Sequence, residues 1–365
     1  MRKFWSKYRL VIIFFVLWRL LLSGIEQIAP FLWPLREGFL GPTHWANFDG
    51  VHYLSIARSG YYTYEQAFFP FYSTLIRWIS QITGLSDVVT ALVVSHVSFL
   101  GGLILFYDLA RLINRRNALW SVVLVLLFPT SFFFASVYTE SLFFLLAVVC
   151  LIAAKRNVWW LAGLCGMLVS NTRLFGVFLY PVVLWQFLKE RQTTRQWQDL
   201  LFISLIPVGL IAYMWYLASS IGDPLAFFHA QPAFGAGRSG GTLIILPQVL
   251  WRYMRILTSV WPSSFIYAVS VFELTIFLFG LWVVWLGLRM RVVGAVYLVY
   301  ALLVLVIPTL TGTLSSIPRY FLSAFPLFIV LANMHNTKIK ALIAMVFSIG
   351  LIVFGAAFLR GHFVS

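Results

Sequence analysis

Asp49 lies in a polar stretch, residues 47–57, between the first two strongly apolar segments of the chain. His52 and Tyr53 follow at spacings of three and four residues, which place the three side chains on one face of a helix. A half-buried carboxylate has a raised proton affinity and can act as a general base near neutral pH. We therefore interpret Asp49 as a candidate base, with His52 orienting it or contacting a hydroxyl. The alternative for His52 is an interfacial side chain without a chemical role.

Arginines in apolar segments indicate the kind of ligand. Arg173, Arg319 and Arg19 lie at or within such segments, where a guanidinium can hold a phosphate through two hydrogen bonds. A cation at membrane depth suits the phosphate of a lipid that enters between helices. Two alternatives remain: Arg19 reaches the interface or pairs with Glu26, and Arg319 is an interfacial anchor.

Other chemistries lack their residues. His44, Asp49 and His52 would make only a crude metal site, and the chain has no Asp-x-Asp pair, so we expect no metal or other cofactor. No nucleophile elbow and no phosphate-binding Gly-x-x-x-x-Gly-Lys loop is present. Cys150 and Cys165 lie inside apolar runs and are expected to be packing residues without a disulfide.

The elements that position these residues are expected to be membrane helices. The chain is 61% hydrophobic and only 10% charged, with a mean hydropathy of +0.92, whereas soluble domains have roughly 25% charged residues. The net charge of +15 is spread in short clusters between apolar segments, which argues against nucleic acid as a partner. We predict an all-α polytopic membrane protein, residues 1–365 forming one domain, with about eleven spans. The candidate spans are 9–28, 88–110, 117–134, 137–154, 158–170, 174–188, 200–219, 265–288, 292–310, 319–333 and 340–359, several interrupted by Pro129, Pro181, Pro207 or Pro308.

Lysine and arginine set the expected orientation. Every lysine falls in a loop on the same side as the N-terminus, which predicts a cytoplasmic N-terminus and a C-terminus outside. Two long external segments follow, residues 29–87 with helical pieces 48–58 and 68–82, and residues 220–264 with an aromatic and basic piece 247–261. External loops of this length form functional surfaces or lids.

Five motifs, read in order, carry a resemblance to a known family. They are residues 47–61 (NFDGVHYLSIARSGY), 68–72 (FFPFY), 128–133 (FPTSFF) with 138–141 (YTES), 222–227 (GDPLAF) with Gln231, and 318–320 (PRY) followed by 325–328 (FPLF). Together they resemble the PIG-V-type mannosyltransferases, the family that adds the second mannose of GPI anchors (GPI mannosyltransferase 2-like), and its prokaryotic relatives. Two residues depart from the pattern: Phe48, where the family usually has Trp before the Asp, and Ser73, where the Phe-Pro-x-Tyr piece of the family is often followed by Pro.

The resemblance implies a GT-C glycosyltransferase with its catalytic acid in the first external loop. Its donor would be a polyprenyl- or dolichyl-phosphate-linked sugar, with mannose expected, and its acceptor a glycan, glycolipid or protein hydroxyl. Asp49 would be the base, His52 and Glu140 would position the base or the acceptor, and residues from Asp223 to Gly241 would form a lid. The candidate substrate-binding residues are Arg319, Arg173, Tyr53, Arg58, Tyr138, Asp223 and Gln231.

Two other classes stay open at this point. A transporter or flippase of a lipid-linked sugar would explain the spans and arginines but has less use for a lone external acid, and the two halves of the chain show no symmetry. A lipid-modifying hydrolase or phosphotransferase lacks a recognisable nucleophile or metal cluster. The expected location is a prokaryotic plasma membrane, or the endoplasmic reticulum if the source is eukaryotic, with membrane lipids as neighbours.

Overall fold

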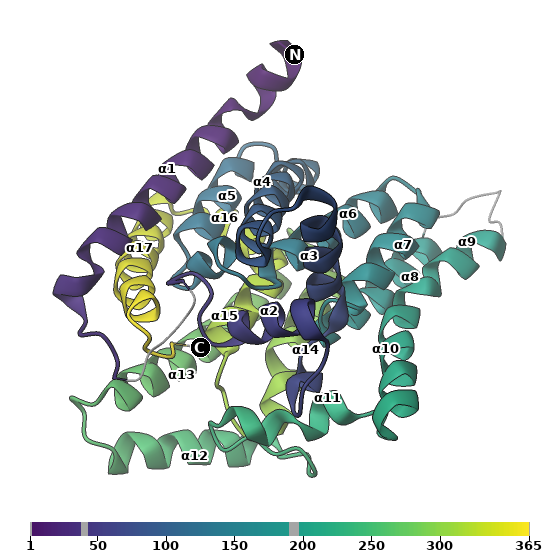
Figure 1. Cartoon of the computed structure of the whole chain (residues 1–365). Helices are drawn as coiled ribbons and strands as arrows, with labels where there is room; N and C mark the ends of the chain where they lie inside the picture. Colours follow the sequence, from purple (N-terminus) through teal and green to yellow (C-terminus); the bar gives the residue numbers. More distant parts are fainter. Residues whose placement is uncertain (1, 38–42, 190–196, 365) are drawn as a thin grey trace.

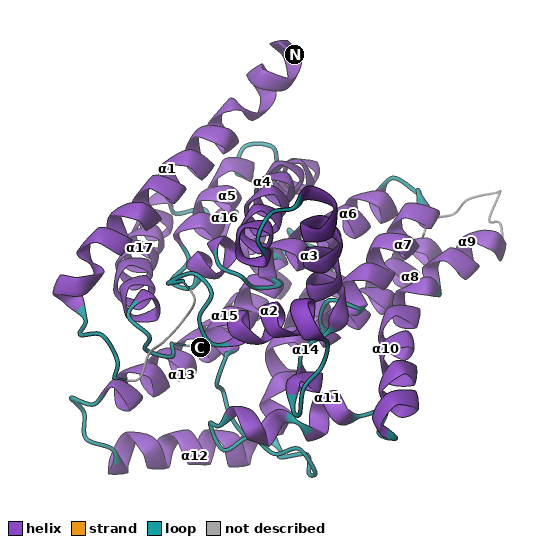
Figure 2. Ribbon diagram, viewed as in Figure 1, coloured by secondary structure: helices purple, strands orange, loops and turns teal. Residues whose placement is uncertain are grey.

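Helices make up the regular secondary structure of the described part of the chain. The computed structural model describes residues 2–37, 43–189 and 197–364, and no strand occurs among them (Figure 2). The α-helices are α1 (Arg2–Leu32), α2 (Asp49–Ser59), α3 (Pro70–Thr83), α4 (Asp87–Ile113), α5 (Ala118–Leu127), α6 (Glu140–Lys155), α7 (Trp159–Ser170), α8 (Leu179–Lys189), α9 (Trp197–Ile203), α10 (Leu205–Ile221), α11 (Ala226–His229), α12 (Leu246–Ser259), α13 (Phe265–Met290), α14 (Ala295–Val306), α15 (Ile317–Ser323), α16 (Pro326–Ala332) and α17 (Thr337–Leu359). Short 3₁₀ helices are η1 (Glu65–Ala67), η2 (Ser131–Ala135), η3 (Leu174–Phe178), η4 (Gln231–Phe234) and η5 (Ile307–Thr311). The expected all-α class is confirmed.

Four of the described helices are long and apolar enough to cross a bilayer. They are α1 (from Phe4), α4, α13 and α17, and the bent pair α9 and α10 would make a fifth. The predicted count of eleven spans is therefore not confirmed. Helix α5, for example, has 10 residues, about 15 Å at 1.5 Å per residue, against roughly 30 Å of hydrocarbon. Such short helices are shielded by their neighbours: most of α6 and nearly all of α15 and α16 is buried inside the protein.

Pro207, one of the prolines expected to interrupt spans, does follow an interruption, the bend of 41° between α9 and α10, and Pro181 lies just after the change from η3 to α8. Pro181 and Pro207 lie in the first turns of α8 and α10, where the missing N–H is not needed for the helical ladder. Pro129 does separate α5 from η2, and Pro308 lies in η5 after α14, as predicted. Hydrogen bonds from side chains, such as Thr130 to the Pro318 carbonyl, satisfy the backbone near such breaks.

The helices form one connected bundle. Helices α4, α6, α7 and α10 pack in succession, and α1 and α17 lie side by side along one edge (Figure 1). Helix α7 lies very close to both α9 and α10. An added Cβ at Gly163 of α7 would lie about 2 Å from the Phe202 carbonyl oxygen of α9, and one at Gly209 of α10 about 2 Å from the Met167 carbonyl oxygen of α7. Ser170 and Asn171 donate to the Ile206 and Gly209 carbonyls across the contact between α7 and α10, at 2.5 and 2.8 Å. Small residues let membrane helices approach closely, and polar side chains such as Ser and Asn form hydrogen bonds between them.

The two segments expected to be external both fold against the same end of the bundle. Residues 48–58 and 68–82 form α2 and α3, and residues 247–261 form α12, each within two residues of the predicted bounds. Arg77 of α3 donates to the last carbonyls of α2, Ile56 and Ala57, at 2.9 and 2.6 Å, which caps the negative end of that helix. Helix α12 lies along the bottom edge in Figure 1, below α2 and α15. Residues 38–42 of the first segment, and Arg191 and Arg195 among the basic residues, lie outside the described part.

Candidate active site

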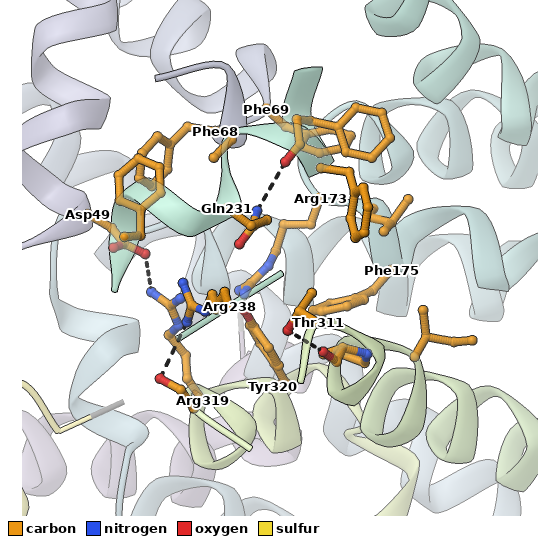
Figure 3. A pocket seen from close by; sticks show the side chains of 18 of the residues that line it. Asp49, Phe68, Phe69, Arg173, Phe175, Gln231, Arg238, Thr311, Arg319 and Tyr320 are labelled. Carbon is orange, nitrogen blue, oxygen red and sulfur yellow. Dashed lines mark hydrogen bonds and ion pairs between the residues drawn. The ribbon is translucent and has the colours of Figure 1, made fainter. Parts of the chain in front are cut away.

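Asp49 and Arg319 meet although they are 270 positions apart. Asp49 is the first residue of α2, and Arg319 lies in the first turn of α15. The Arg319 Nη1 donates to Asp49 Oδ2 (Figure 3), and the two side chains are only 18% and 8% exposed, Asp49 being the more exposed. Both helices begin after a residue with positive φ, Phe48 at 52° and Ser316 at 69°. Side chains other than glycine rarely adopt that conformation, and such strain gathers at functional sites.

A second carboxylate continues this charged row into the interior. Glu140, the first residue of α6, accepts from Arg173 Nη1 at 2.5 Å, and its same oxygen lies 3.6 Å from Arg319 Nε. The order of charges is therefore Asp49, Arg319, Glu140, Arg173, with opposite signs adjacent. Asp49 and Glu140 each begin a helix, where the macrodipole stabilises a negative charge.

Three of the four members of this row line a cavity of about 260 Å³. Asp49, Arg173 and Arg319 contribute to its wall, and Glu140 lies behind it. Aromatic and aliphatic side chains form much of the remaining wall, as Figure 3 shows for Phe68, Phe69 and Phe175. The complete lining is Asp49, Tyr53, Ala67, Phe68, Phe69, Thr172, Arg173, Leu174, Phe175, Phe227, Phe228, Gln231, Phe234, Arg238, Leu243, Ile307, Pro308, Leu310, Thr311, Ser315, Arg319 and Tyr320.

A third guanidinium, Arg238, enters the cavity from the glycine-rich stretch before α12. Its Nη2 donates to the hydroxyls of Ser315 and Ser316 at 3.4 and 3.1 Å, and Figure 3 shows it between Asp49 and Tyr320. Arg252 of α12 braces the stretch by donating to the carbonyls of Ala236, Gly237 and Gly312 at 3.0 to 3.2 Å. The site assignment from sequence omitted Arg238 as a binding residue, although it lies within the predicted lid, residues 223–241, in a run rich in glycine.

The charge state of Asp49 differs from the expectation. Burial raises the pKa of its carboxyl, but the charge and hydrogen bond of Arg319, with a further contribution from Arg238, outweigh burial and leave the pKa below its ordinary value. The predicted raised proton affinity is thus wrong for this arrangement, because the cation is in direct contact. Neighbouring Tyr53 has a pKa raised by burial and by the negative charge of Asp49, so it stays a neutral hydroxyl.

Four of the sequence-selected residues besides Asp49 line the cavity: Arg319, Arg173, Tyr53 and Gln231. Two more, Glu140 and Tyr138, are buried directly behind it. Tyr138 donates to the Asn47 carbonyl at 2.9 Å, and the Arg319 guanidinium lies 5.5 Å from its ring centre. Tyr138 therefore contacts the segment before Asp49 rather than the cavity.

Three other selected residues lie outside the cavity wall. His52 bonds Glu65 at 3.1 Å, rather than Asp49, and stacks on Phe68. Arg58 is largely exposed and pairs with Asp87 at 2.8 Å. Asp223 is on the surface, where a hydrogen bond from His229 at 2.7 Å lowers the pKa of its carboxyl.

Two further alternatives from the sequence are placed elsewhere. Arg19 donates to Ser23 at 3.2 Å and lies 5.1 Å from the Trp45 ring centre, away from the cavity wall. His44 bonds the Leu359 carbonyl at 3.1 Å. Among the described residues no three His, Cys, Asp or Glu side chains gather as a metal site would need. Cys150 and Cys165 are free and buried, as expected.

Fold and site together define a helical, multi-pass membrane protein with a charged cavity at one end of its bundle. A family model described as Mannosyltransferase (PIG-V) matches residues 31–230, more than half of the 365 residues, and the chain belongs to this family. The chain is also similar to human GPI alpha-1,6-mannosyltransferase 2, with 28% identity over 166 residues that cover 41% of this chain and 33% of the human protein. The similarity thus spans about a third of that relative's length. The match to the family model contains Asp49, Glu140 and Arg173, whereas Arg238 and Arg319 lie beyond its residues.

Proposed function

We propose that this chain is a membrane-embedded glycosyltransferase that moves mannose from a polyprenyl- or dolichyl-phosphate carrier to an acceptor hydroxyl, with inversion. The family and the human relative, both named for mannose transfer, support the reaction class and the sugar. One structural observation carries the proposal: a carboxylate and a guanidinium from opposite ends of the chain meet in one cavity.

The composition of the cavity supports a lipid-linked donor. Three guanidiniums, Arg173, Arg238 and Arg319, share the cavity with aromatic and aliphatic side chains. Guanidinium groups suit phosphate oxygens, and an apolar wall suits the first isoprene units of a carrier. The chain has no nucleotide-binding glycine loop, which agrees with a donor whose phosphate belongs to a lipid.

The reaction follows from the roles that these groups can fill. Asp49 accepts the proton of the acceptor hydroxyl, and the hydroxyl oxygen forms a bond to the anomeric carbon of the sugar. The bond between that carbon and the phosphate oxygen breaks, and its electron pair leaves with the lipid phosphate, which gains one negative charge. Arg319 stabilises this charge, and Arg173 supports it through Glu140. Preorganised charges of this kind often contribute more to the rate than any other feature of an active site.

The same proposal includes the orientation of the chain in the membrane and the acceptor. We place residues 29–87 and 220–264 on the non-cytoplasmic side of a single GT-C-type membrane domain, with both termini oriented as the lysine distribution indicates. Residues of both segments, such as Phe68 of the first and Arg238 of the second, line the same cavity, which supports this arrangement. The acceptor is a hydroxyl of a glycan, glycolipid or protein, and no metal is assigned a role.

Transfer by the purified protein in liposomes tests the proposal. Labelled polyprenyl-phosphate mannose and membrane extract as acceptor source should give a labelled product whose new glycosidic bond mass spectrometry detects. Asp49→Asn should lower the rate by about 10²–10⁴-fold, the usual contribution of a general base. The matched control Asp87→Asn changes an acid that pairs with Arg58 outside the cavity and should keep the rate. Movement of intact donor across the bilayer without a new bond would instead indicate a transporter.

A further inference from the structure

The Asp49–Arg319 contact is incompatible with a bound donor in an inverting transfer. In such a reaction the base and the leaving oxygen lie on opposite faces of the anomeric carbon, so the sugar ring lies between them. Arg319, assigned above to the leaving phosphate, touches Asp49 directly, which leaves no room for a ring. This step rests on the proposed function.

Arg238 lies close enough to Arg319 for one anion to contact both guanidiniums. Arg238 and Arg319 both donate through Nη2 to the Ser316 hydroxyl, at 3.1 and 3.4 Å. Arg173 and Arg319 have carboxylate partners, whereas the hydrogen bonds of the Arg238 side chain go to two neutral serines. Two guanidiniums that converge on one hydroxyl repel each other and favour an anion that contacts both.

The position of Arg238 is fixed by its surroundings. The Ser239 N–H donates to the Thr311 carbonyl at 2.7 Å, and the Ile244 N–H donates to the Leu310 carbonyl at 2.8 Å. Arg252 Nη1 links the two segments by donating to the Gly237 and Gly312 carbonyls. The arginine is thus held against the loop that leads into α15.

We propose that the Asp49–Arg319 pair is the closed resting state of this site, and that the phosphate of the lipid donor opens it by binding Arg238 and drawing Arg319 away from Asp49. The sugar ring then occupies the space between acid and cation. Asp49 loses the cation that keeps it deprotonated, so its affinity for the acceptor proton rises only when donor is present. The charge that develops on the leaving phosphate is met by two guanidiniums instead of one.

Binding of a polyprenyl monophosphate without sugar tests this exchange apart from transfer. Affinity is measured in nanodiscs by native mass spectrometry for the wild type, Asp49→Asn, Arg238→Gln, Arg319→Gln and the double variant Asp49→Asn/Arg319→Gln. Polyprenyl alcohol and inorganic phosphate serve as ligand controls that separate chain from headgroup. The matched charge controls are Asp87→Asn and Arg255→Gln; Arg255 is an exposed arginine on α12. Size-exclusion profiles check that each variant folds.

We expect Asp49→Asn to tighten binding about tenfold because the competing carboxylate is gone, and Arg238→Gln to weaken it about tenfold, the scale of one charge-assisted hydrogen bond. Arg238→Lys, which keeps the charge without the fork, should fall between. The tightening should disappear when Arg319 is already Gln, since the two residues then have nothing to exchange. Unchanged binding in Asp49→Asn, or equal tightening with Arg319 replaced, would overturn the exchange while leaving the transferase proposal intact. A wild type that transfers mannose but does not bind the monophosphate would also refute the exchange, whereas absence of both would remove the proposed function.

Discussion

Arg173 and Glu140 form an ion pair, 2.5 Å from Nη1 to Oε1, with side chains only 11% and 1% exposed. The same Glu140 oxygen faces Arg319 at 3.6 Å. One carboxylate thus separates two guanidiniums that would otherwise repel each other, and it fixes the distance at which they can act on a ligand.

Replacing Glu140 by Leu should destabilise the protein by about 3 kcal/mol, because breaking a buried pair from one side leaves an uncompensated charge. The free energy of unfolding in mixed micelles, measured with denaturant, checks this. The double variant Glu140→Leu/Arg173→Met should recover most of the stability, since a buried pair can be replaced by apolar groups of similar volume. If single and double variants are equally unstable, the pair is not what Glu140 contributes.

The contact between α7 and α10 predicts a second, purely structural effect. A Cβ at Gly209 would lie 2.0 Å from the Met167 carbonyl oxygen, so Gly209→Ala must push the helices apart and should cost about 1–3 kcal/mol of unfolding free energy. Gly24→Ala is the matched control, because an added Cβ there meets nothing within 4 Å. Thermal unfolding should separate the two variants; equal stabilities would contradict the close packing.

The positions of the helices were largely predictable from the sequence, and so was the selection of three charged residues that line the cavity. Helices α2 and α12 lie within two residues of their predicted bounds because polar spacing and turn residues are local signals. Asp49, Arg173 and Arg319 stood out because charge beside apolar segments is costly without a purpose. Their presence in one cavity is seen in the structure, and their chemical roles stay predictions.

The remainder depended on information that local patterns do not contain. The Asp49–Arg319 contact joins residues 270 positions apart, and no spacing rule reaches that far. In the sequence, Arg238 looks like any arginine of a glycine-rich loop; its contacts with Ser315 and Ser316 are visible only in the structure. Hydropathy measures how apolar a segment is, without saying whether lipid or protein covers it. Phe143 of α6, for example, is apolar and fully buried in the protein, so hydropathy alone does not settle the number of spans.

Arg252 offers a test of how the cavity is braced. Arg252→Gln removes hydrogen bonds to three carbonyls in the segments that hold Arg238 and lead into α15, without changing a cavity residue. We expect kcat/KM for the lipid donor to fall by about 10–100-fold, because a displacement near 1 Å in a positioning group has effects of that size. Arg255→Gln, three residues further along α12 and exposed, should retain the wild-type value. A wild-type kcat/KM in Arg252→Gln would mean that Arg238 holds its position without this brace.

The pH dependence of transfer should separate the closed site from the occupied one. In the free protein the pKa of Asp49 is lowered by Arg319 against the effect of burial, so the carboxylate stays charged below the ordinary Asp value of about 3.9. The sign for stability follows: the pair stabilises the fold above that value, and the contribution is lost as the pH falls through the lower folded pKa. Asp49→Asn should lack this loss in unfolding measurements below about pH 4, where the wild type weakens.

For the rates, kcat/KM reports the free protein and kcat reports the donor-bound one. If the phosphate takes Arg319 away, the largest influence that lowers the pKa of Asp49 is lost and burial is opposed only by the smaller contributions of Arg238 and His52. The acid limb of kcat should then lie at higher pH than the acid limb of kcat/KM. In Arg319→Gln, whose absolute rate will be low, the two limbs should coincide because the cation is missing in both states. Full pH profiles of wild type and variant measure this difference. Coincident limbs in the wild type would show that Asp49 keeps its cation throughout the reaction.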